Sequence, residues 1–268
     1  MTPAAALLAA YDAQLRGLGE TPGAIAVTTL GPLFVATFAE GRRFISYRAL
    51  TSDDGTPLDA AGVHALVAAV AQHLLDDPGA TEAEWKTRAH DVAPGLDGAL
   101  REHGFEPEHT ESIMIGEAQV LADADTPLPD GVTLRRITSE ADVRSMASAS
   151  SDAFGEPLDD RYAQDLLRRQ EQDPDMELWI AEAGGVIVTT GRLEPVAGTE
   201  FAGIWGGATL PEWRHRGIYR ALTAVRARSA IAAGKRYLQS DSTEYSRPIL
   251  ERNGFQKVSE TTPYVWHR

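Results

Sequence analysis

The segment LPEWRHRGIYRAL, from Leu210 to Leu222, combines features that suit a bound anion. Pro211 ends an apolar stretch with the pattern of a strand, and an amphipathic helix begins a few residues later. The first N–H groups of a helix have no intrahelical acceptor, and the helix dipole adds partial positive charge there. A phosphate is a natural partner for such groups. Gly217 has no Cβ, which allows a tight turn and the close approach of a ligand.

Three arginines, Arg214, Arg216 and Arg220, lie on both sides of Gly217 and add long-range attraction for an anion. A Walker lysine loop and a full Gly-x-Gly-x-x-Gly pattern are both missing, which disfavours nucleotide hydrolysis and dinucleotide-linked redox chemistry. A plainer interpretation stays open at this point, in which the arginines and His215 form a solvated charge cluster beside a helix start.

Composition limits the classes of function. A chain of 268 residues favours two domains, and a net charge of −14 argues against general nucleic-acid binding. The sequence has no cysteine, which excludes disulfides, thiolate nucleophiles and thiol metal sites. The seven histidines show no ligand spacing, so we expect no metal site.

Neither a targeting segment nor a membrane span is expected. The stretch MTPAAALLAAYDAQL lacks a basic region and contains Asp12, which does not fit a signal peptide. No apolar run is long enough to cross a bilayer. The expected location is cytoplasmic.

The stretch ADADTPLPDG, residues 122–131, has no hydrophobic periodicity and predicts a linker between domains at 1–124 and 130–268. The second half has the predicted order β-α-α-β-β-β-α-β-α-β-β, which is a mixed α/β (α+β) pattern. Gly184 and Gly185 predict a hairpin turn, and Gly206 with Gly207 predicts a bulge in a strand. A helix is expected from about Arg216 to Ala233, and two last strands, near Lys257 and Val265, close the chain.

The two halves share a pattern. ALREHGFEPEHTESIMIG, from Ala99 to Gly116, resembles ILERNGFQKVSETTPYVW, from Ile249 to Trp266. The order strand-helix-strand-helix-Gly-Phe-strand occurs in both halves. A Gly-Phe pair alone carries little weight because glycines often end helices, but the shared order over about fifty residues favours an internal duplication.

The second half, about residues 130–268, resembles the GNAT superfamily of acyl-CoA-dependent N-acyltransferases. The phosphate-loop motif of that family is Arg/Gln-x-x-Gly-x-Gly/Ala, and the matching run here is Arg214-His215-Arg216-Gly217-Ile218-Tyr219. Tyr219 departs from the motif, so its side chain must point away from the pyrophosphate or the loop must widen. With the internal similarity, the resemblance implies tandem GNAT-like domains, each a mixed, mostly antiparallel sheet flanked by helices, with a degenerate first half.

The resemblance implies that acetyl-CoA lies in a gap between two splayed strands, with the pyrophosphate at residues 214–220. Main-chain groups at the end of the strand 204–210 would meet the pantetheine arm. The residues expected at the cofactor are Thr209, Leu210, Arg214, His215, Arg216, Gly217, Ile218, Tyr219, Arg220 and Ser246.

The catalytic residues are less well defined. Many family members have a tyrosine that protonates the leaving thiolate, five residues before the Gly-Phe phenylalanine, and this chain has Leu250 there. Tyr245 and Tyr219 are the nearest alternatives, and Tyr245 is the candidate proton donor; for both, packing is the competing role. Ser246 either caps a helix or contacts CoA. Glu194 is a candidate base, or a solvated surface residue.

The first half lacks the phosphate loop. At the corresponding place the chain reads TSDDGTPLDAAG, residues 51–62, with Asp53, Asp54 and Asp59. Three carboxylates would repel a pyrophosphate, so we expect no CoA in this half.

The expected function is transfer of an acetyl or other short acyl group from acyl-CoA to an amine. The acceptor would be a small polar or cationic molecule, and the protein a monomer or homodimer. A non-catalytic acyl-CoA-binding sensor or interaction module is the alternative, and Leu250 favours it. A third interpretation, a structural protein with a chance arginine cluster, predicts no binding of CoA.

Overall fold

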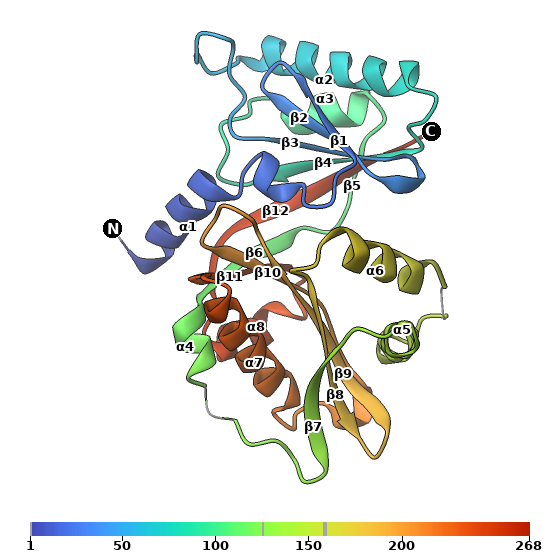
Figure 1. Ribbon diagram of the computed structural model, residues 1–268. Coiled ribbons are helices and arrows are strands. Elements are labelled where there is room, and N and C mark those ends of the chain that lie inside the picture. The colour runs from blue at the N-terminus through green and yellow to red at the C-terminus, as the bar shows by residue number, and fades with distance from the viewer. Residues whose placement is uncertain (1, 125, 158–159) are drawn as a thin grey trace. The chain divides into compact units, whose positions relative to one another are not determined.

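The computed structural model describes residues 2–124, 126–157 and 160–268 (Figure 1). The chain forms two compact units, each built from more than one stretch of sequence. The first unit contains Met1–Ile113, Asp241–Arg247 and Lys257–Arg268, and the second contains Met114–Ser240 and Pro248–Gln256.

The elements of the first unit are α1 (Pro3–Gln14), η1 (Leu18–Glu20), β1 (Ala26–Leu30), β2 (Leu33–Thr37), η2 (Ala39–Gly41), β3 (Arg42–Tyr47), α2 (Ala60–Asp76), β4 (Glu82–Arg88), α3 (Leu96–Glu102), β5 (Glu106–Pro107) and β12 (Gln256–His267). Its sheet has the order β1-β2-β3-β4-β12, with β5 paired to β12. The paired strands are antiparallel except β3 and β4, which run parallel and are joined through α2.

The core of the first unit lies between α2 and its sheet. Asp59 accepts a hydrogen bond from Gly62 N (2.8 Å) and caps the start of α2. Val63, Val67 and Leu74 are fully buried at helical spacing, so one face of α2 covers the sheet.

The elements that lie wholly or mostly in the second unit are β6 (Glu111–Glu117), α4 (Ala118–Ala122), β7 (Val132–Ile137), α5 (Glu140–Phe154), α6 (Asp160–Gln172), β8 (Glu177–Ala183), β9 (Val186–Pro195), β10 (Phe201–Thr209), η3 (Pro211–Trp213), α7 (Ile218–Ala232), β11 (Tyr237–Ser242) and α8 (Arg247–Asn253). The sheet order is β6-β11-β10-β9-β8-β7. β10 and β11 are parallel, and β7 to β10 form antiparallel pairs. Gly184 and Gly185, with φ of +57° and +84°, make the predicted turn between β8 and β9.

Helices cover both faces of the second sheet, with α7 on one side and α5 and α6 on the other (Figure 1). Side chains along β9 alternate between the two faces. A Cβ on Gly191 would meet Arg226 of α7, whereas Arg192 contacts Tyr162 of α6. Gly191 therefore faces α7, and Arg192, the next residue of β9, faces α6.

The two Gly-Phe pairs of the predicted repeat end two short helices with the same hydrogen bonds. Phe105 N donates to Leu100 O (3.0 Å) after α3, and Phe255 N donates to Leu250 O (3.1 Å) after α8. The glycine before each phenylalanine has a positive φ, +82° at Gly104 and +105° at Gly254. Both helices thus end in the same left-handed cap, which glycine adopts without strain.

Two strands follow these caps, β6 after α3 and β12 after α8. Each belongs mostly to the other unit from the one that the sequence order suggests. β12 pairs with β4, and its residues Tyr264 and Trp266 are buried in the core of the first unit. Met114 of β6 is buried in a core of the second unit. The units therefore differ from the expected boundaries 1–124 and 130–268, because a strand pattern does not specify which edge the strand pairs with. β12 is also one strand of twelve residues rather than the two predicted short ones.

The linker expected at 122–131 follows α4, which ends at Ala122, and precedes β7, which begins at Val132. Residue 125 lies outside the described residues, as do 158 and 159 near the break predicted at Gly155 and Pro157.

Candidate cofactor and active site

The predicted phosphate loop is a turn between β10 and α7 in the second unit. His215 and Gly217 have positive φ values of 62° and 77°, and Gly217 is the N-cap of α7 without a side-chain cap. Ile218, Tyr219 and Arg220 follow as the first helical residues, whose N–H groups have no intrahelical acceptor. The loop therefore presents several main-chain donors at a positive helix end.

Gly217 is needed for a second reason. A Cβ at this position would lie 2.9 Å from Cγ2 of Thr126 in the linker. Any other residue at 217 would therefore combine a left-handed backbone with a steric clash.

The arginines of the loop have different surroundings. Arg214 donates from Nε to Thr209 O (3.0 Å) and from Nη2 to Ala153 O (2.7 Å), so it ties the loop to β10 and to the end of α5. The Arg216 guanidinium lies over the Trp213 ring, 4.9 Å from its centroid. His215, Arg216 and Arg220 are exposed, so their charge is available to a ligand in solvent.

β10 carries the predicted bulge directly before the loop. Its register with β9 shifts between Trp205 and Ala208, and Gly206 has a φ of +60°. The carbonyl of Gly206 accepts from Thr190 Oγ1 (3.1 Å), and the backbone of Gly207 is exposed. The bulge therefore leaves polar backbone outside the regular ladder.

β10 and β11 part near this bulge. Their parallel pairing runs from Phe201 with Tyr237 to Gly203 with Gln239. Beyond Gly203 each strand continues without a register partner on the other, and we call this point the second-unit fork. The fork and the bulge lie at the end of β10, where the resemblance places a gap between two splayed strands.

The main-chain groups predicted to meet the pantetheine arm already have partners. Leu210 N donates to Val188 O (3.0 Å), and Thr209 O accepts from Arg214 Nε. Exposed backbone lies earlier, at Gly207, because the bulge interrupts the ladder there.

Tyr219 lies against β10 and not over the start of α7, which is the first of the two arrangements expected for its departure from the motif. A Cβ on Gly207 would lie 2.7 Å from Cε2 of Tyr219, so the ring lies against β10 beside this glycine. The guanidinium of Arg226, which is fully buried, lies 5.6 Å from the centre of the same ring. Ile218 is buried beneath the loop in a small core with Val188.

The residues predicted near the leaving group differ in exposure. Leu250 is 3 % exposed and packs in a core of the second unit, whereas Tyr245 is 81 % exposed in the turn before α8. The Ser246 hydroxyl contacts Thr243 Oγ1 (3.1 Å), and Ser246 N donates to the same oxygen (3.4 Å). Thr243 rather than Ser246 thus has the capping role at this turn.

A polar cluster lies on the face of β9 that α6 covers. Arg192 Nε is 3.1 Å from Glu194 Oε1, and Arg169 Nη1 is 3.2 Å from the same oxygen. Glu194, the predicted candidate base, is therefore paired with two guanidinium groups. Tyr162 OH lies 3.2 Å from the Cβ position of Gly206, which places this cluster beside the bulge.

Sequence reasoning missed Arg192, Arg169 and Tyr162. Arg192 and Glu194 are two residues apart in a strand and so share a face, which is a signal that the pattern contains. Tyr162 and Arg169 come from α6, and their approach to β9 depends on tertiary packing.

The first unit also has a point where parallel strands part. β3 and β4 pair from Arg42 with Glu82 to Ile45 with Trp85. The next residues include Ser46 and Lys86, and we call this point the first-unit fork.

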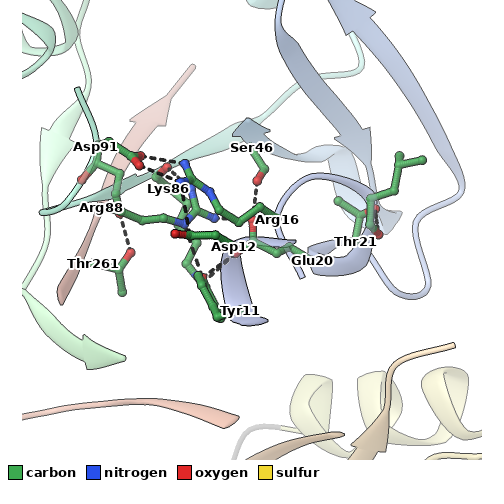
Figure 2. Close-up of polar contacts among 12 residues, drawn as sticks. Tyr11, Asp12, Arg16, Glu20, Thr21, Ser46, Lys86, Arg88, Asp91 and Thr261 are labelled. Atoms are coloured by element: carbon green, nitrogen blue, oxygen red, sulfur yellow. Dashed lines mark hydrogen bonds and ion pairs between the residues drawn. The ribbon is translucent and has the colours of Figure 1, made fainter. Parts of the chain in front are cut away.

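Glu20 occupies the first-unit fork (Figure 2). Its carboxylate accepts hydrogen bonds from Ser46 Oγ, from Arg88 Nη2 and from Tyr11 OH (3.0 Å). Lys86 Nζ lies 3.3 Å from Glu20 Oε1. The chain thus fills this fork with its own side chain.

Neighbouring charges set the pKa values of Glu20 and Lys86 in this cluster. Burial raises the pKa of Glu20, but the attraction of Arg88 and Lys86 outweighs it and holds the pKa at about 2. Burial lowers the pKa of Lys86, yet Asp241, Tyr11 and Glu20 hold it above its ordinary value. The groups therefore stay charged together.

The acidic loop of the first half has structural roles. Asp54 Oδ1 accepts from Ser52 Oγ (2.7 Å) and Thr56 N (3.0 Å), which hold its pKa at about 2, and Asp59 caps α2. That CoA is excluded from this half stays a prediction.

Residues 143–255 match the family model described as Acetyltransferase (GNAT) family. The chain resembles the structure of a GCN5-related N-acetyltransferase from Kribbella flavida, at 20 % identity and a TM-score of 0.65, over 99 % of this chain and 96 % of that one. It also resembles a tandem GNAT protein from the clavulanic acid biosynthesis pathway, at 14 % identity and a TM-score of 0.62, over 88 % and 78 %. No curated protein matches the sequence.

The match at residues 143–255 is therefore to a GNAT acetyltransferase model, and 88 % of the chain shares the fold of a tandem GNAT protein. In the described part of the chain, no helix is long and apolar enough to span a bilayer. Nor do the described residues contain a group of three potential metal ligands from His, Cys, Asp and Glu.

Proposed function

We propose that the protein is an acyl-CoA-dependent N-acyltransferase that binds the diphosphate of one acyl-CoA at the start of α7 in the second unit. The observation that carries the proposal is the combination of the second-unit fork, the bulge at Gly206 and Gly207, and the uncapped start of α7. Acetyl-CoA supplies the acyl group as a thioester. The acceptor is a small polar or cationic amine, the proposed location is cytoplasmic, and neither a metal nor a nucleic acid takes part.

The roles of the residues follow from their positions. The amides of Ile218, Tyr219 and Arg220 bind the diphosphate, with exposed Arg216 and His215 adding charge. Gly217 permits the approach, and Arg214 fixes the loop through two carbonyls. Thr209, Leu210 and Ser246 remain proposed contacts through atoms other than those already paired.

The reaction needs a neutral amine and a proton for the departing sulfur. A carbon–nitrogen bond forms and the carbon–sulfur bond breaks, while the nitrogen releases one proton and the thiolate takes one. Tyr245 is the proposed donor. In Tyr245→Phe, a fall in kcat of about 100-fold or more would support that role, and an unchanged kcat would assign the proton to solvent.

A non-catalytic acyl-CoA sensor is the second candidate, and the buried Leu250 at the usual acid position favours it. Release of free CoA thiol from acetyl-CoA, measured across a panel of amines, separates the two. Amine-dependent release supports the enzyme. Binding of acetyl-CoA by calorimetry with no release for any amine supports the sensor, and no binding at all contradicts both.

A further inference from the structure

Arg192 is a nearly buried guanidinium with unused hydrogen-bonding capacity. Its side chain is 14 % exposed, and its only ion-pair partner among the described residues is Glu194, itself 12 % exposed. Nε lies 3.1 Å from Glu194 Oε1 but makes no hydrogen bond, because the N–H direction misses the oxygen. The one hydrogen bond that its side chain donates within the described residues is a long one, from Nη1 to Tyr162 OH (3.5 Å).

This arrangement leaves N–H donors of Arg192 without acceptors among the residues that the structure describes. A guanidinium has five N–H donors in a planar fork, and a buried polar group without partners is unfavourable. Glu194 divides its Oε1 between Arg192 and Arg169, so it does not fully compensate Arg192. A second carboxylate, placed against the Nη atoms, would supply the missing acceptors in the geometry that guanidinium groups prefer.

The guanidinium of Arg192 lies beside the bulge. The Cβ position of Gly206 is 3.7 Å from Arg192 Nη1 and 3.8 Å from its Cζ. α7 covers the opposite face of this part of the sheet, where Tyr219 lies against Gly207. A molecule held by Arg192 would therefore reach the bulge from the face that carries α6.

We propose that the acyl acceptor is an amine that also carries a carboxylate, such as an α-amino acid, and that Arg192 binds this carboxylate. This inference rests on the proposed function. One carbon separates the two groups in an α-amino acid, so a carboxylate on Arg192 leaves the nitrogen beside Gly206.

The guanidinium pair also argues against a phosphate on the acceptor. A phosphate dianion would need more than one uncommitted cation, and Arg169 is already shared between Glu194 and Asp165 (3.4 Å). A single carboxylate matches the single underused guanidinium in charge and shape.

Matched acceptors test the proposal. Ornithine is compared with putrescine, and phenylalanine with phenethylamine, in thiol-release assays with acetyl-CoA. We expect kcat/KM at least tenfold higher for the carboxylate-bearing member of the pair whose side chain is accepted. In Arg192→Gln the preference for the carboxylate-bearing acceptor falls about 10- to 100-fold, as expected for loss of a charged hydrogen bond. The loss comes mainly from a higher KM for that acceptor. The preference of Arg192→Lys lies between those of the wild type and Arg192→Gln. Arg136→Gln, which removes a strand arginine paired with Glu177, keeps the preference.

A binding measurement covers the case in which no amine is turned over. N-acetylated amino acids and the matching N-acetylated amines are titrated calorimetrically into wild-type protein and Arg192→Gln. Binding that requires both the carboxylate and Arg192 supports the inference even if catalysis fails. Equal affinity or turnover for both members of every pair, or equal losses for both in Arg192→Gln, overturns it. Absence of acetyl-CoA binding contradicts the proposed function instead.

Discussion

The ring of Tyr219 lies against Gly207, and a Cβ on that glycine would lie 2.7 Å from the ring. The two residues belong to different sides of the cofactor loop, one at the start of α7 and one in the bulge of β10. Tyr219 thereby replaces the small residue of the family motif without placing its ring over the helix start. The contact explains how the loop accommodates a residue that the motif does not predict.

Gly207→Ala should disturb this contact. The added methyl group forces the Tyr219 ring to move, which we expect to lower the free energy of unfolding by about 1–3 kcal/mol and to weaken acetyl-CoA binding. Thermal unfolding and calorimetry measure the two effects. When Tyr219 is already replaced by alanine, Gly207→Ala should lower the stability less, because the effects of substitutions at two residues in contact are not additive.

Gly98→Ala is the matched control. Gly98 lies within α3, and a Cβ there would meet nothing within 4 Å. We expect this change to stabilise the protein by up to about 1 kcal/mol, from helix propensity. If both glycine variants behaved alike, the contact between Tyr219 and Gly207 would have no energetic role.

Glu20→Gln tests the filled fork of the first unit. The substitution leaves Lys86 and Arg88 buried beside one carboxylate fewer, and breaking such a pair lowers stability by about 3–5 kcal/mol. Chemical denaturation measures the loss. Glu40→Gln, a carboxylate at a surface turn, controls for the change of net charge. A loss below about 1 kcal/mol would mean that Glu20 behaves like a surface group.

The same residue predicts a pH dependence. The pKa of Glu20 is about 2 in the folded protein, below its ordinary value of 4.5, so the unfolded chain binds the proton more readily. Its contribution is present above pH 4.5 and is lost as the pH falls from 4.5 towards 2. The stability difference between wild type and Glu20→Gln should shrink across that window by about 3 kcal/mol. A constant difference between pH 5 and pH 3 would contradict the assignment.

Leu250→Tyr tests whether the usual acid position is available. Leu250 is 3 % exposed and packs in a core with Leu121 and Phe255. A tyrosine there should lower stability by about 1–3 kcal/mol through overpacking and should not raise kcat. Leu250→Met, which nearly conserves volume, should be tolerated. An increase in kcat in the tyrosine variant would show that its hydroxyl reaches the thiolate.

The sequence predicts what local patterns determine. The helix expected from about Arg216 to Ala233 is Ile218–Ala232, and the glycine pair at 206 and 207 marks a bulge, because periodicity and glycine act locally. The partner of β12 did not follow, since an alternating strand fits several edges. The fork at Glu20 did not follow either, because its partner Lys86 is 66 residues away in the chain.

The candidate site also has features that follow from the local sequence and others that depend on tertiary packing. The turn at Gly217 follows from its residue type and the helix that comes next. The direction of the Arg214 side chain does not, because its two acceptors, Thr209 O and Ala153 O, are brought to it by packing of β10 and α5. The underused donors of Arg192 depend on α6 in the same sense.

The most direct test of the loop at residues 214–220 is calorimetric titration of acetyl-CoA into three proteins. These are the wild type, the double variant Arg216→Glu with Arg220→Glu, and a control double variant, Arg42→Glu with Arg48→Glu. The control carries the same charge change on exposed residues of the first half. The account predicts binding to the wild type and the control. It predicts affinity about tenfold weaker in the loop variant, since each exposed ion pair contributes about 1 kcal/mol or less. No heat of binding to the wild type at millimolar acetyl-CoA, or equal affinity in all three proteins, would contradict it.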